Sequence, residues 1–232
     1  MTPTLQVVLA LVGAYLVGAL PFGWLAGRVR GLDIRSAGSG NIGATNVARV
    51  LGWRWGLGVF LLDVGKGFGP TLVAGRVLLE LAGRNSWSDP TTYLCWLSVG
   101  AATVIGHNFP IYLGLRGGKG VATTLGVALG VYPDLTVPAG LALGVWVAVV
   151  ALTRYVSAGS ICAAVAFPAA FVLVSWGRGR ALLAEGWPLL AFTALLAGLV
   201  LVRHRSNLGR LWAGTESKIG QEKEGASSTS GG

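Results

Sequence analysis

Seven stretches of mostly apolar residues alternate along the chain with short polar segments. In sequence order they cover residues 4–27, 53–79, 92–106, 121–132, 135–153, 157–176 and 187–202. A helix that crosses a bilayer needs about 20 residues that are mostly apolar, and two of the seven stretches are short. The pattern predicts an all-α, polytopic membrane protein with seven transmembrane helices. No Lys or Arg precedes the first stretch, which we interpret as an uncleaved span rather than a signal peptide.

Glycine residues are concentrated in one polar segment and recur at a spacing of four in several apolar stretches. The third and fourth stretches flank a Gly-rich polar segment, residues 107–120. One hypothesis is that part of this segment dips to membrane depth, which is tolerated only where protein or water shields the backbone. Glycines spaced by four predict faces at which helices approach closely. These pairs are Gly65 and Gly69, Gly126 and Gly130, and Gly140 and Gly144.

The composition supports a membrane protein and indicates that its partner is negatively charged. Charged residues make up 12% of the chain and hydrophobic residues 53%. Soluble proteins usually devote about 25% of their residues to charge, so this supply is too small to cover a water-exposed surface. Lys and Arg number 18 against 9 Asp and Glu, a net charge of +9. The remaining charges therefore favour a ligand or a surface that is negatively charged.

The distribution of the cations predicts the orientation. Thirteen of the 18 Lys and Arg residues fall on the face that the chain reaches after its odd-numbered stretches. Cytoplasmic loops carry the excess of Lys and Arg, so we expect the N-terminus outside and the C-terminus in the cytoplasm. Residues 1–218 are expected to form a single transmembrane domain. The polar, Gly/Ser-rich residues 219–232 are expected to form a disordered tail.

Three segments hold most of the polar side chains. They are residues 38–49, 106–120 and 203–218, which follow the first, third and seventh stretches. Segments that follow odd-numbered stretches lie on the same side of the membrane, so the three segments are expected to meet at the cytoplasmic face.

The first segment reads GSGNIGATNVAR. It matches the dinucleotide fingerprint Gly-x-Gly-x-x-Gly, but that pattern has meaning only between a strand and a helix, and here it follows an apolar span. We interpret it as a Gly-rich turn that leads into a short helix over residues 44–52, whose N-terminus faces an anion. Thr45 and Arg49 then share one face of that helix. The alternative is a polar loop with an Arg that reaches the membrane interface.

The second segment ends in Arg116-Gly-Gly-Lys119-Gly. Glycines around a lysine allow a phosphate to approach the backbone while the ammonium supplies charge. The segment is no Walker A loop, because Gly120 stands where Ser or Thr would bind Mg²⁺, so ATP hydrolysis is disfavoured. His107 and Asn108 are candidates for the same space, and a structural role for His107 is as consistent with the sequence as a catalytic one.

The third segment brings charged and polar residues close together, among them Arg203, His204, Arg205, Asn207, Arg210, Glu216 and Lys218. If it is helical, His204 and Asn207 share a face. A basic run after a last span is commonly a topology anchor or a lipid headgroup contact. That alternative leaves the embedded His, Asn and Glu unexplained.

Asp63 and Lys66 lie within the second apolar stretch, three residues apart. Ionisable residues at membrane depth are costly and usually paired, so an ion pair is predicted, with structural and substrate-contacting roles both open for Lys66. No Gly-x-Ser-x-Gly elbow, no His followed five residues on by Asp, and no cluster with metal-ligand spacing is present. Covalent and metal catalysis therefore lose support.

The three segments together closely resemble the motifs of the bacterial acyl-phosphate:glycerol-3-phosphate acyltransferases, the PlsY type. They read SGNIGATNVAR, GHNFPIYLGLRGGKG and RHRSNLGRLWAGTESK, in that order. The resemblance implies a seven-helix enzyme of the bacterial inner membrane, with its active site facing the cytoplasm. It also implies transfer of a fatty acyl group from acyl phosphate to the 1-hydroxyl of glycerol 3-phosphate, which yields lysophosphatidate and phosphate. Membrane lipid is the expected surrounding, with no cofactor, metal or nucleic acid.

The resemblance, with the motif residues, also gives the candidate site. The catalytic candidates are His204, Asn207, Lys119, Arg49 and Ser39. Substrate-binding candidates are Asn41, Thr45, Asn46, His107, Asn108, Gly117, Gly118, Gly120, Arg203 and Lys66, and Glu216 and Asp63 are structural candidates. Arg49 and Lys119 are expected to neutralise phosphates, while His204 with Asn207 orients the attacking hydroxyl or stabilises an oxyanion. Whether His204 or the substrate phosphate is the base stays open.

A transporter of a phosphorylated metabolite or lipid is the competing function. Broken helices and charges at the membrane midplane would suit it, but transporters usually contain internal repeats. No motif of this chain occurs twice.

Overall fold

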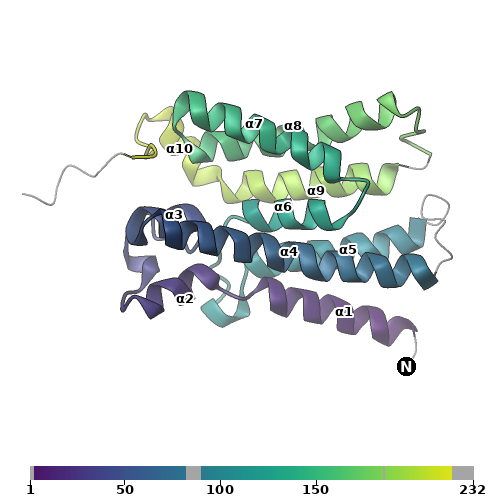
Figure 1. Ribbon diagram of the computed structural model, residues 1–232, viewed down its shortest axis with the longest axis horizontal. Coiled ribbons are helices and arrows are strands. Elements are labelled where there is room, and N and C mark those ends of the chain that lie inside the picture. Colours follow the sequence, from purple (N-terminus) through teal and green to yellow (C-terminus); the bar gives the residue numbers. More distant parts are fainter. Residues whose placement is uncertain (1–2, 82–89, 185, 221–232) are drawn as a thin grey trace, which may run out of the picture.

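The computed structural model describes residues 3–81, 90–184 and 186–220, and within these ranges the regular structure is entirely helical. The helices, shown in Figure 1, are α1 (Pro3–Gly18), α2 (Phe22–Val29), η1 (Ile34–Ser36), α3 (Ala44–Leu51), α4 (Trp53–Leu81), α5 (Pro90–Asn108), η3 (Ile111–Leu113), α6 (Val121–Gly130), α7 (Thr136–Thr153), α8 (Val156–Gly177), α9 (Trp187–Arg203) and α10 (Arg205–Trp212).

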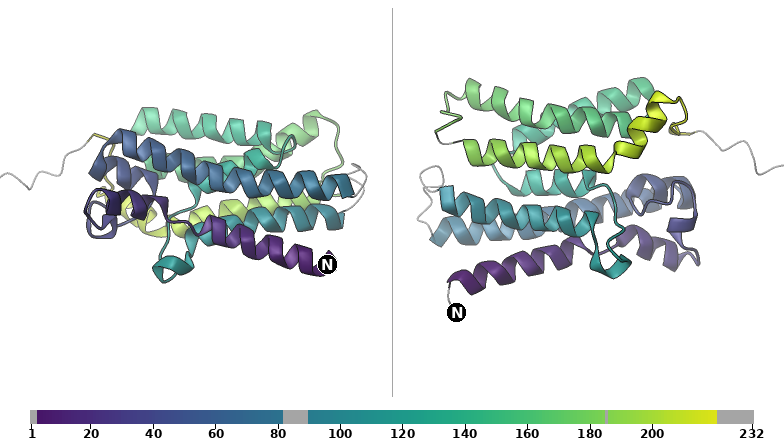
Figure 2. Two further views of the ribbon diagram at one scale, coloured as in Figure 1. Left: turned by 60° about the horizontal axis from the view of Figure 1, so that its bottom comes forward. Right: turned by 180° about the vertical axis from the view of Figure 1, so that it is seen from behind.

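The long helices lie side by side, with α4, α5 and α6 in the middle. Helices α7, α8 and α9 lie on one side of this group and α1 on the other (Figure 1). The short helices α2, α3 and α10 gather at one end of the long ones, as the two views of Figure 2 also show. The three polar segments therefore meet at one end of the bundle, as the sequence predicts.

Five of the described helical segments are long and apolar enough to cross a membrane. A sixth is present if α9 and α10, which are bent by 57°, count as one span. The first span is interrupted at Leu20 and Pro21, where α1 stops and α2 begins, because proline disfavours a helical conformation in the residue before it. Helix α6 has 10 residues, about 15 Å at a rise of 1.5 Å per residue, so it is shorter than the span predicted over residues 121–132.

The outer faces of the helices are apolar. Leu9 on α1, Val147 on α7 and Val165 on α8 each expose about half of their surface. Because the bilayer core offers no water to polar groups, a spanning protein presents such a surface to lipid. The interior is built around aromatic side chains, among them Trp96, Phe171 and Phe192.

Glycines bring α4 and α6 into close contact. A Cβ added at Gly126 would collide with the backbone of Val64, and one at Gly67 with the backbone of Thr123. Close packing through Gly126 and Gly130 is thus confirmed. For the other glycines predicted to do this, Gly65, Gly69, Gly140 and Gly144, the prediction is wrong, because nothing lies within 4 Å of an added Cβ. Spacing alone does not tell which face of a helix meets a neighbour.

Candidate functional site

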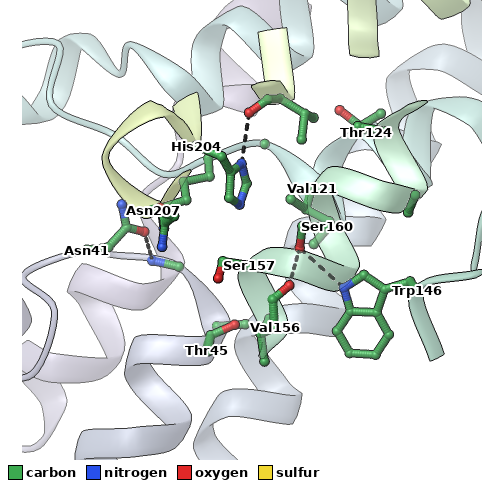
Figure 3. Close-up of a pocket in the computed structure, with 18 of the residues that line it drawn as sticks. Asn41, Thr45, Val121, Thr124, Trp146, Val156, Ser157, Ser160, His204 and Asn207 are labelled. Carbon is green, nitrogen blue, oxygen red and sulfur yellow. Dashed lines mark hydrogen bonds between the residues drawn. The ribbon is translucent and has the colours of Figure 1, made fainter. Parts of the chain in front are cut away.

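A cavity of about 1060 Å³ opens between α3, α6, α7, α8, α9 and α10. One end is lined by the polar segments that the sequence singles out, and Figure 3 shows part of this end. The other end is lined by apolar side chains of α6 to α9, which include Leu125, Ala142, Phe167 and Leu196. A single space therefore joins cationic groups to an apolar compartment.

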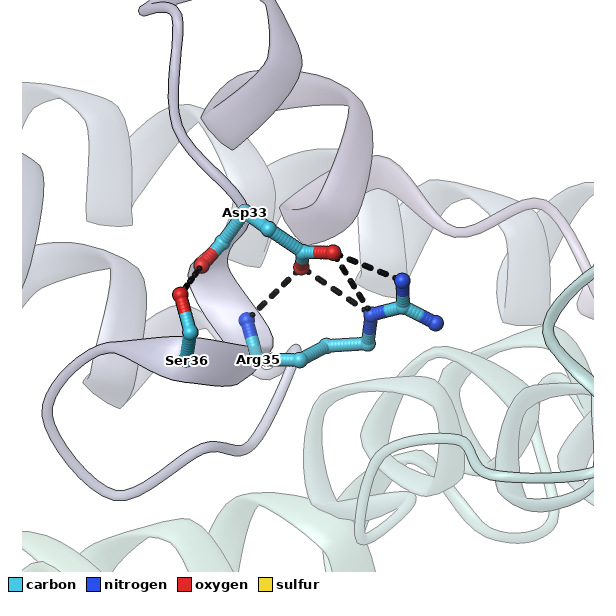
Figure 4. Close-up of polar contacts among 3 residues, drawn as sticks. All are labelled: Asp33, Arg35 and Ser36. Carbon is cyan, nitrogen blue, oxygen red and sulfur yellow. Dashed lines mark hydrogen bonds and ion pairs between the residues drawn. The ribbon is translucent and has the colours of Figure 1, made fainter.

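The loop before α3 is shaped at its entry by Asp33. Its carboxylate accepts hydrogen bonds from the backbone N–H of Arg35 at 3.0 Å and from Nη2 of the same residue at 2.6 Å (Figure 4). Ser36 Oγ donates to the Asp33 carbonyl at 2.8 Å. Hydrogen bonds from Arg35 lower the pKa of Asp33 to about 2, so this carboxylate stays charged and caps η1 at neutral pH.

Asn46 organises the rest of this loop from within. Its buried Nδ2 donates to the carbonyls of Asn41 at 2.8 Å and Ala37 at 3.1 Å, and its Oδ1 accepts from the N–H of Ser39 at 2.8 Å. Gly38 has a φ of +60°, and a Cβ there would collide with Asn46 Oδ1. The amide of Asn46 is thus engaged by the protein, and we interpret its role as building the loop rather than binding substrate.

The loop and α3 present several polar groups to the cavity. Asn41 Oδ1 accepts from the N–H of Gly43 at 2.8 Å, which turns the chain into α3. Ser39, Asn41, Thr45 and Arg49 all line the cavity. Thr45 and Arg49 therefore share one face of α3, as the sequence predicts, and this face is turned toward the cavity.

The glycines before Lys119 pack against the end of α5. The N–H of Gly117 donates to the carbonyl of Asn108 at 3.2 Å and the N–H of Gly118 to the carbonyl of His107 at 3.1 Å. Arg203 donates from Nε to the Gly118 carbonyl at 3.0 Å and from Nη2 to the Gly117 carbonyl at 2.9 Å. A Cβ on Gly118 would collide with the ring of His107. The segment has glycines here because α5 leaves no room for side chains.

These contacts divide the predicted residues of this segment into two groups. Lys119, Gly120 and His107 line the cavity, whereas Asn108, Gly117, Gly118 and Arg203 lie outside its lining. The backbone donors of Gly117 and Gly118 are already used. We therefore interpret this turn as a support that aims Lys119 into the cavity, not as a cradle whose own N–H groups hold a phosphate.

Lys119 belongs to a chain of hydrogen bonds across the polar end. Its Nζ lies 2.6 Å from Asn207 Oδ1, Asn207 Nδ2 donates to Glu216 Oε1 at 2.6 Å, and Arg210 Nε donates to Glu216 Oε2 at 2.7 Å. Burial lowers the pKa of Lys119 to about 8, although the charge of Glu216 opposes this shift. The ammonium is therefore a cation that titrates close to neutral pH.

His204 lies at the bend between α9 and α10 and is buried. Its Nδ1 is 2.8 Å from the carbonyl oxygen of Val200 (Figure 3). A carbonyl oxygen only accepts, so Nδ1 carries the proton, and in the neutral ring Nε2 is left as an acceptor. The residue lines the cavity, which gives the polar end one hydrogen-bond acceptor with a fixed tautomer.

The predicted ion pair in α4 is confirmed. Lys66 Nζ lies 2.7 Å from Asp63 Oδ1 and donates to the Leu20 carbonyl at 3.0 Å, where α1 gives way to α2. His107 Nδ1 is 3.6 Å from the same carboxylate oxygen. Asp63 and His107 line the cavity, but Lys66 does not. We therefore interpret Lys66 as a structural residue at the helix break, apart from the residues that line the cavity.

Several lining residues are not among those the sequence singles out. Trp146 Nε1 donates to Ser160 Oγ at 3.2 Å, and Ser157 lies one turn before Ser160 on α8 (Figure 3). These groups lie between the polar and the apolar end, and their only sequence signal is a pair of Ser residues at helical spacing in an apolar stretch. Thr215 and Ser217 also line the cavity, as does Arg210, which the sequence places in the third segment without assigning it to the site. No cluster suited to a metal ion occurs among the described residues.

Comparison with known proteins gives consistent matches along nearly the whole chain. The family model described as "Glycerol-3-phosphate acyltransferase" matches residues 8–214. A protein of that name from Geobacter sulfurreducens is 45% identical over 208 residues, which cover 89% of this chain and 94% of the relative. One from Rhodospirillum rubrum is 42% identical over 227 residues, covering 97% and 96%.

Two solved structures are similar to this fold. Both are crystal structures of PlsY, described as an integral membrane glycerol 3-phosphate acyltransferase. The glycerol 3-phosphate form has a TM-score of 0.76 and 36% identity, and covers 93% of this chain and 96% of that one. The lysophosphatidic acid form has a TM-score of 0.74 and 35% identity, with the same coverage.

Proposed function

Because this chain belongs to the glycerol-3-phosphate acyltransferase family, we propose that it transfers a fatty acyl group from acyl phosphate to the 1-hydroxyl of glycerol 3-phosphate. The products are lysophosphatidate and inorganic phosphate. The related crystal structures, which carry glycerol 3-phosphate in one form and lysophosphatidic acid in the other, support this substrate and product.

The observation that carries the proposal is the two-part cavity. Both substrates bear phosphate, and one also bears a long acyl chain. At the polar end, Lys119, Arg49 and Arg210 can bind anions, while apolar side chains of α6 to α9 can surround the acyl chain. Such a space holds both substrates with their reacting groups together, and fixed alignment of two reactants is a large source of rate enhancement.

The chemistry needs little from the protein beyond charge and alignment. Acyl phosphate is a mixed anhydride with a good leaving group. The hydroxyl oxygen of glycerol 3-phosphate attacks the carbonyl carbon, the tetrahedral intermediate collapses, and the bond to the phosphate oxygen breaks. Lys119 and Arg49 neutralise the phosphates, and the ammonium also stabilises charge that develops on the carbonyl oxygen.

His204 is suited to hold the attacking hydroxyl. Its Nε2 accepts the hydroxyl hydrogen bond, because Nδ1 is committed to Val200. The proton leaves through this nitrogen or through the phosphate dianion of the substrate. Both amide atoms of Asn207 are engaged by Lys119 and Glu216, so we assign to Asn207 the alignment of Lys119.

The polar end is assigned to the cytoplasmic side of the inner membrane. The excess of Lys and Arg on the segments that form it supports this orientation. With α6 counted as a short span and α9 with α10 as one bent span, the helices make seven passages, which leaves the N-terminus outside.

A reconstitution with chemically defined substrates tests the proposal. Purified protein is incubated with palmitoyl phosphate and labelled glycerol 3-phosphate, and both products are quantified. We expect 1-acyl lysophosphatidate and inorganic phosphate in equal amounts. Absence of both products, with glycerol 3-phosphate accumulating inside proteoliposomes, would contradict the enzyme and favour transport.

A further inference from the structure

After α10 the chain runs along the cavity as a strap, defined here as residues 213–219. The strap begins at a helix end of the Schellman type: Gly214 has a φ of +69°, its N–H donates to Leu211, and the N–H of Thr215 donates to Arg210 at 2.8 Å. Thr215, Glu216 and Ser217 then line the polar end of the cavity. The strap is therefore part of the wall of the site.

The far end of the strap is fixed by Arg154, at the turn between α7 and α8. Arg154 Nη2 donates to the Ile219 carbonyl at 2.7 Å, and the Arg154 carbonyl accepts from the N–H of Ile219 at 2.9 Å. Beside this pair, Lys218 Nζ lies 5.3 Å from the ring centroid of Tyr155. Ile219, expected to open a disordered tail, is thus docked, while residues 221–232 lie outside the described ranges.

The middle of the strap carries the carboxylate that supports the site. Glu216 accepts from Asn207, and Asn207 accepts from Lys119. Arg154 itself is not among the residues that line the cavity. The contact with Ile219 therefore links Arg154 to the site through the strap.

We infer that Arg154 is a positioning residue for acyl transfer: by fixing Ile219 it holds the strap along the cavity and keeps Glu216 against Asn207, which aligns the ammonium of Lys119. The inference rests on the proposed function, since it concerns the same site. It extends the site to Arg154, which lies 65 positions before its partner Ile219 in the sequence.

Release of the strap has a measurable electrostatic consequence. The anionic group that faces Lys119 is Glu216 of the strap. The cations that face it from α3, α9 and α10 are Arg49, Arg203 and Arg210, and His204 lies at the bend. A freed strap removes the negative neighbour and leaves the positive ones. The pKa of Lys119 then shifts from its value of about 8, because loss of the carboxylate lowers the pKa while water that enters at the opened wall raises it.

Two variants release the strap without touching the cavity. Arg154→Gly removes the guanidinium, and glycine adopts the φ of +62° at this position without strain. Ile219→Pro removes the N–H that the Arg154 carbonyl accepts. Arg178→Gly is the matched control, because Arg178 is an exposed arginine at the end of α8. Deletion of residues 221–232 is a second control, which leaves Ile219 in place.

The pKa of Lys119 is measured by competitive acetylation with mass spectrometry, alongside turnover. We expect both strap variants to lower kcat by about tenfold, with a shifted pKa of Lys119 and an unchanged melting temperature, while both controls match the parent protein. In the double variant with Glu216→Gln, we expect Arg154→Gly to add no further loss, because both changes break one linkage.

The inference is overturned if Lys119 titrates in Arg154→Gly as it does in the parent, or if the two changes reduce kcat independently. Acetylation of Lys119 requires no turnover. A parent protein that forms no lysophosphatidate would therefore refute the proposed function, while the titration of Lys119 would still decide the role of Arg154.

Discussion

The Nζ of Lys119 lies 2.6 Å from Oδ1 of Asn207, a residue 88 positions later in the chain. This contact joins the glycine-rich turn after α5 to helix α10. It places one cation at the polar end of the cavity, where we propose that a substrate phosphate binds.

Removal of this cation should impair acyl transfer severely. For Lys119→Ala we expect a loss of kcat of about two powers of ten or more, as is typical when a group that stabilises transition-state charge is deleted. Arg116→Met, in the same loop but outside the cavity lining, is the control and should retain activity. Activity of Lys119→Ala close to that of the parent protein would exclude its role as a phosphate partner.

The pH dependence should follow the same ammonium. Burial lowers the pKa of Lys119 to about 8, and the protonated form is the active one in this account. We expect kcat/KM to be constant between about pH 7, where the substrate phosphate is a dianion, and this pKa, and to fall as the pH rises through it. In Glu216→Gln the fall should begin at a lower pH, because the carboxylate that favours the ammonium is gone. A profile that is flat to pH 10 would contradict this assignment.

The role of His204 can be decided by one pair of substitutions. Its Nδ1 partner is the backbone carbonyl of Val200 and not a carboxylate, so the protein does not stabilise an imidazolium as a catalytic triad does. We therefore expect an orienting role, in which His204→Gln retains turnover within a few fold while His204→Ala loses about tenfold or more. An equal loss of about 10²–10⁴ in both variants would identify His204 as an essential general base.

The apolar end should determine which acyl chains are accepted. Ala142 is buried on α7 and lines this end, so Ala142→Phe fills space that a long chain would occupy. We expect kcat/KM for long chains to fall relative to short ones by about 10-fold or more, as is usual for loss of a few methylene contacts. Val147→Phe, on the exposed face of the same helix, should leave the chain-length preference unchanged, and a shift in both variants would contradict this placement.

The glycine-rich turn should tolerate no side chain at Gly118. A Cβ there collides with the ring of His107, so in Gly118→Ala the turn that carries Lys119 or the His107 ring in the cavity wall must move. We expect a loss of activity of about tenfold or more, by the reasoning that small misplacements of catalytic groups are costly. Gly58→Ala on α4, where an added Cβ meets nothing within 4 Å, is the matched control. Equal activity of the two variants would show that the turn is not a support for Lys119.

The periodic features of the molecule are well predicted from the sequence. Helical spacing correctly puts Thr45 and Arg49 on one face, and it correctly pairs Asp63 with Lys66. The three polar segments meet because each follows an odd-numbered apolar stretch. These features depend on helix geometry and on the order of the spans, and both can be read from the sequence.

The sequence does not predict which of the polar residues face the cavity and which support the structure. Asn41 and Asn46 look equivalent in the motif, yet Asn46 is buried with its amide engaged by the loop backbone. Lys66 contacts the carbonyl of Leu20 only because α1 is interrupted there. Contacts such as that of Arg154 with Ile219 arise from tertiary packing, which neither spacing nor composition reveals.

A comparison of acyl donors decides whether this protein uses acyl phosphate. Purified protein with labelled glycerol 3-phosphate is supplied in turn with acyl phosphate, acyl-CoA and acyl carrier protein that carry the same chain. We expect lysophosphatidate from acyl phosphate alone, because the proposed reaction relies on a phosphate leaving group held by Lys119 and Arg49. Equal rates with the thioester donors would contradict it.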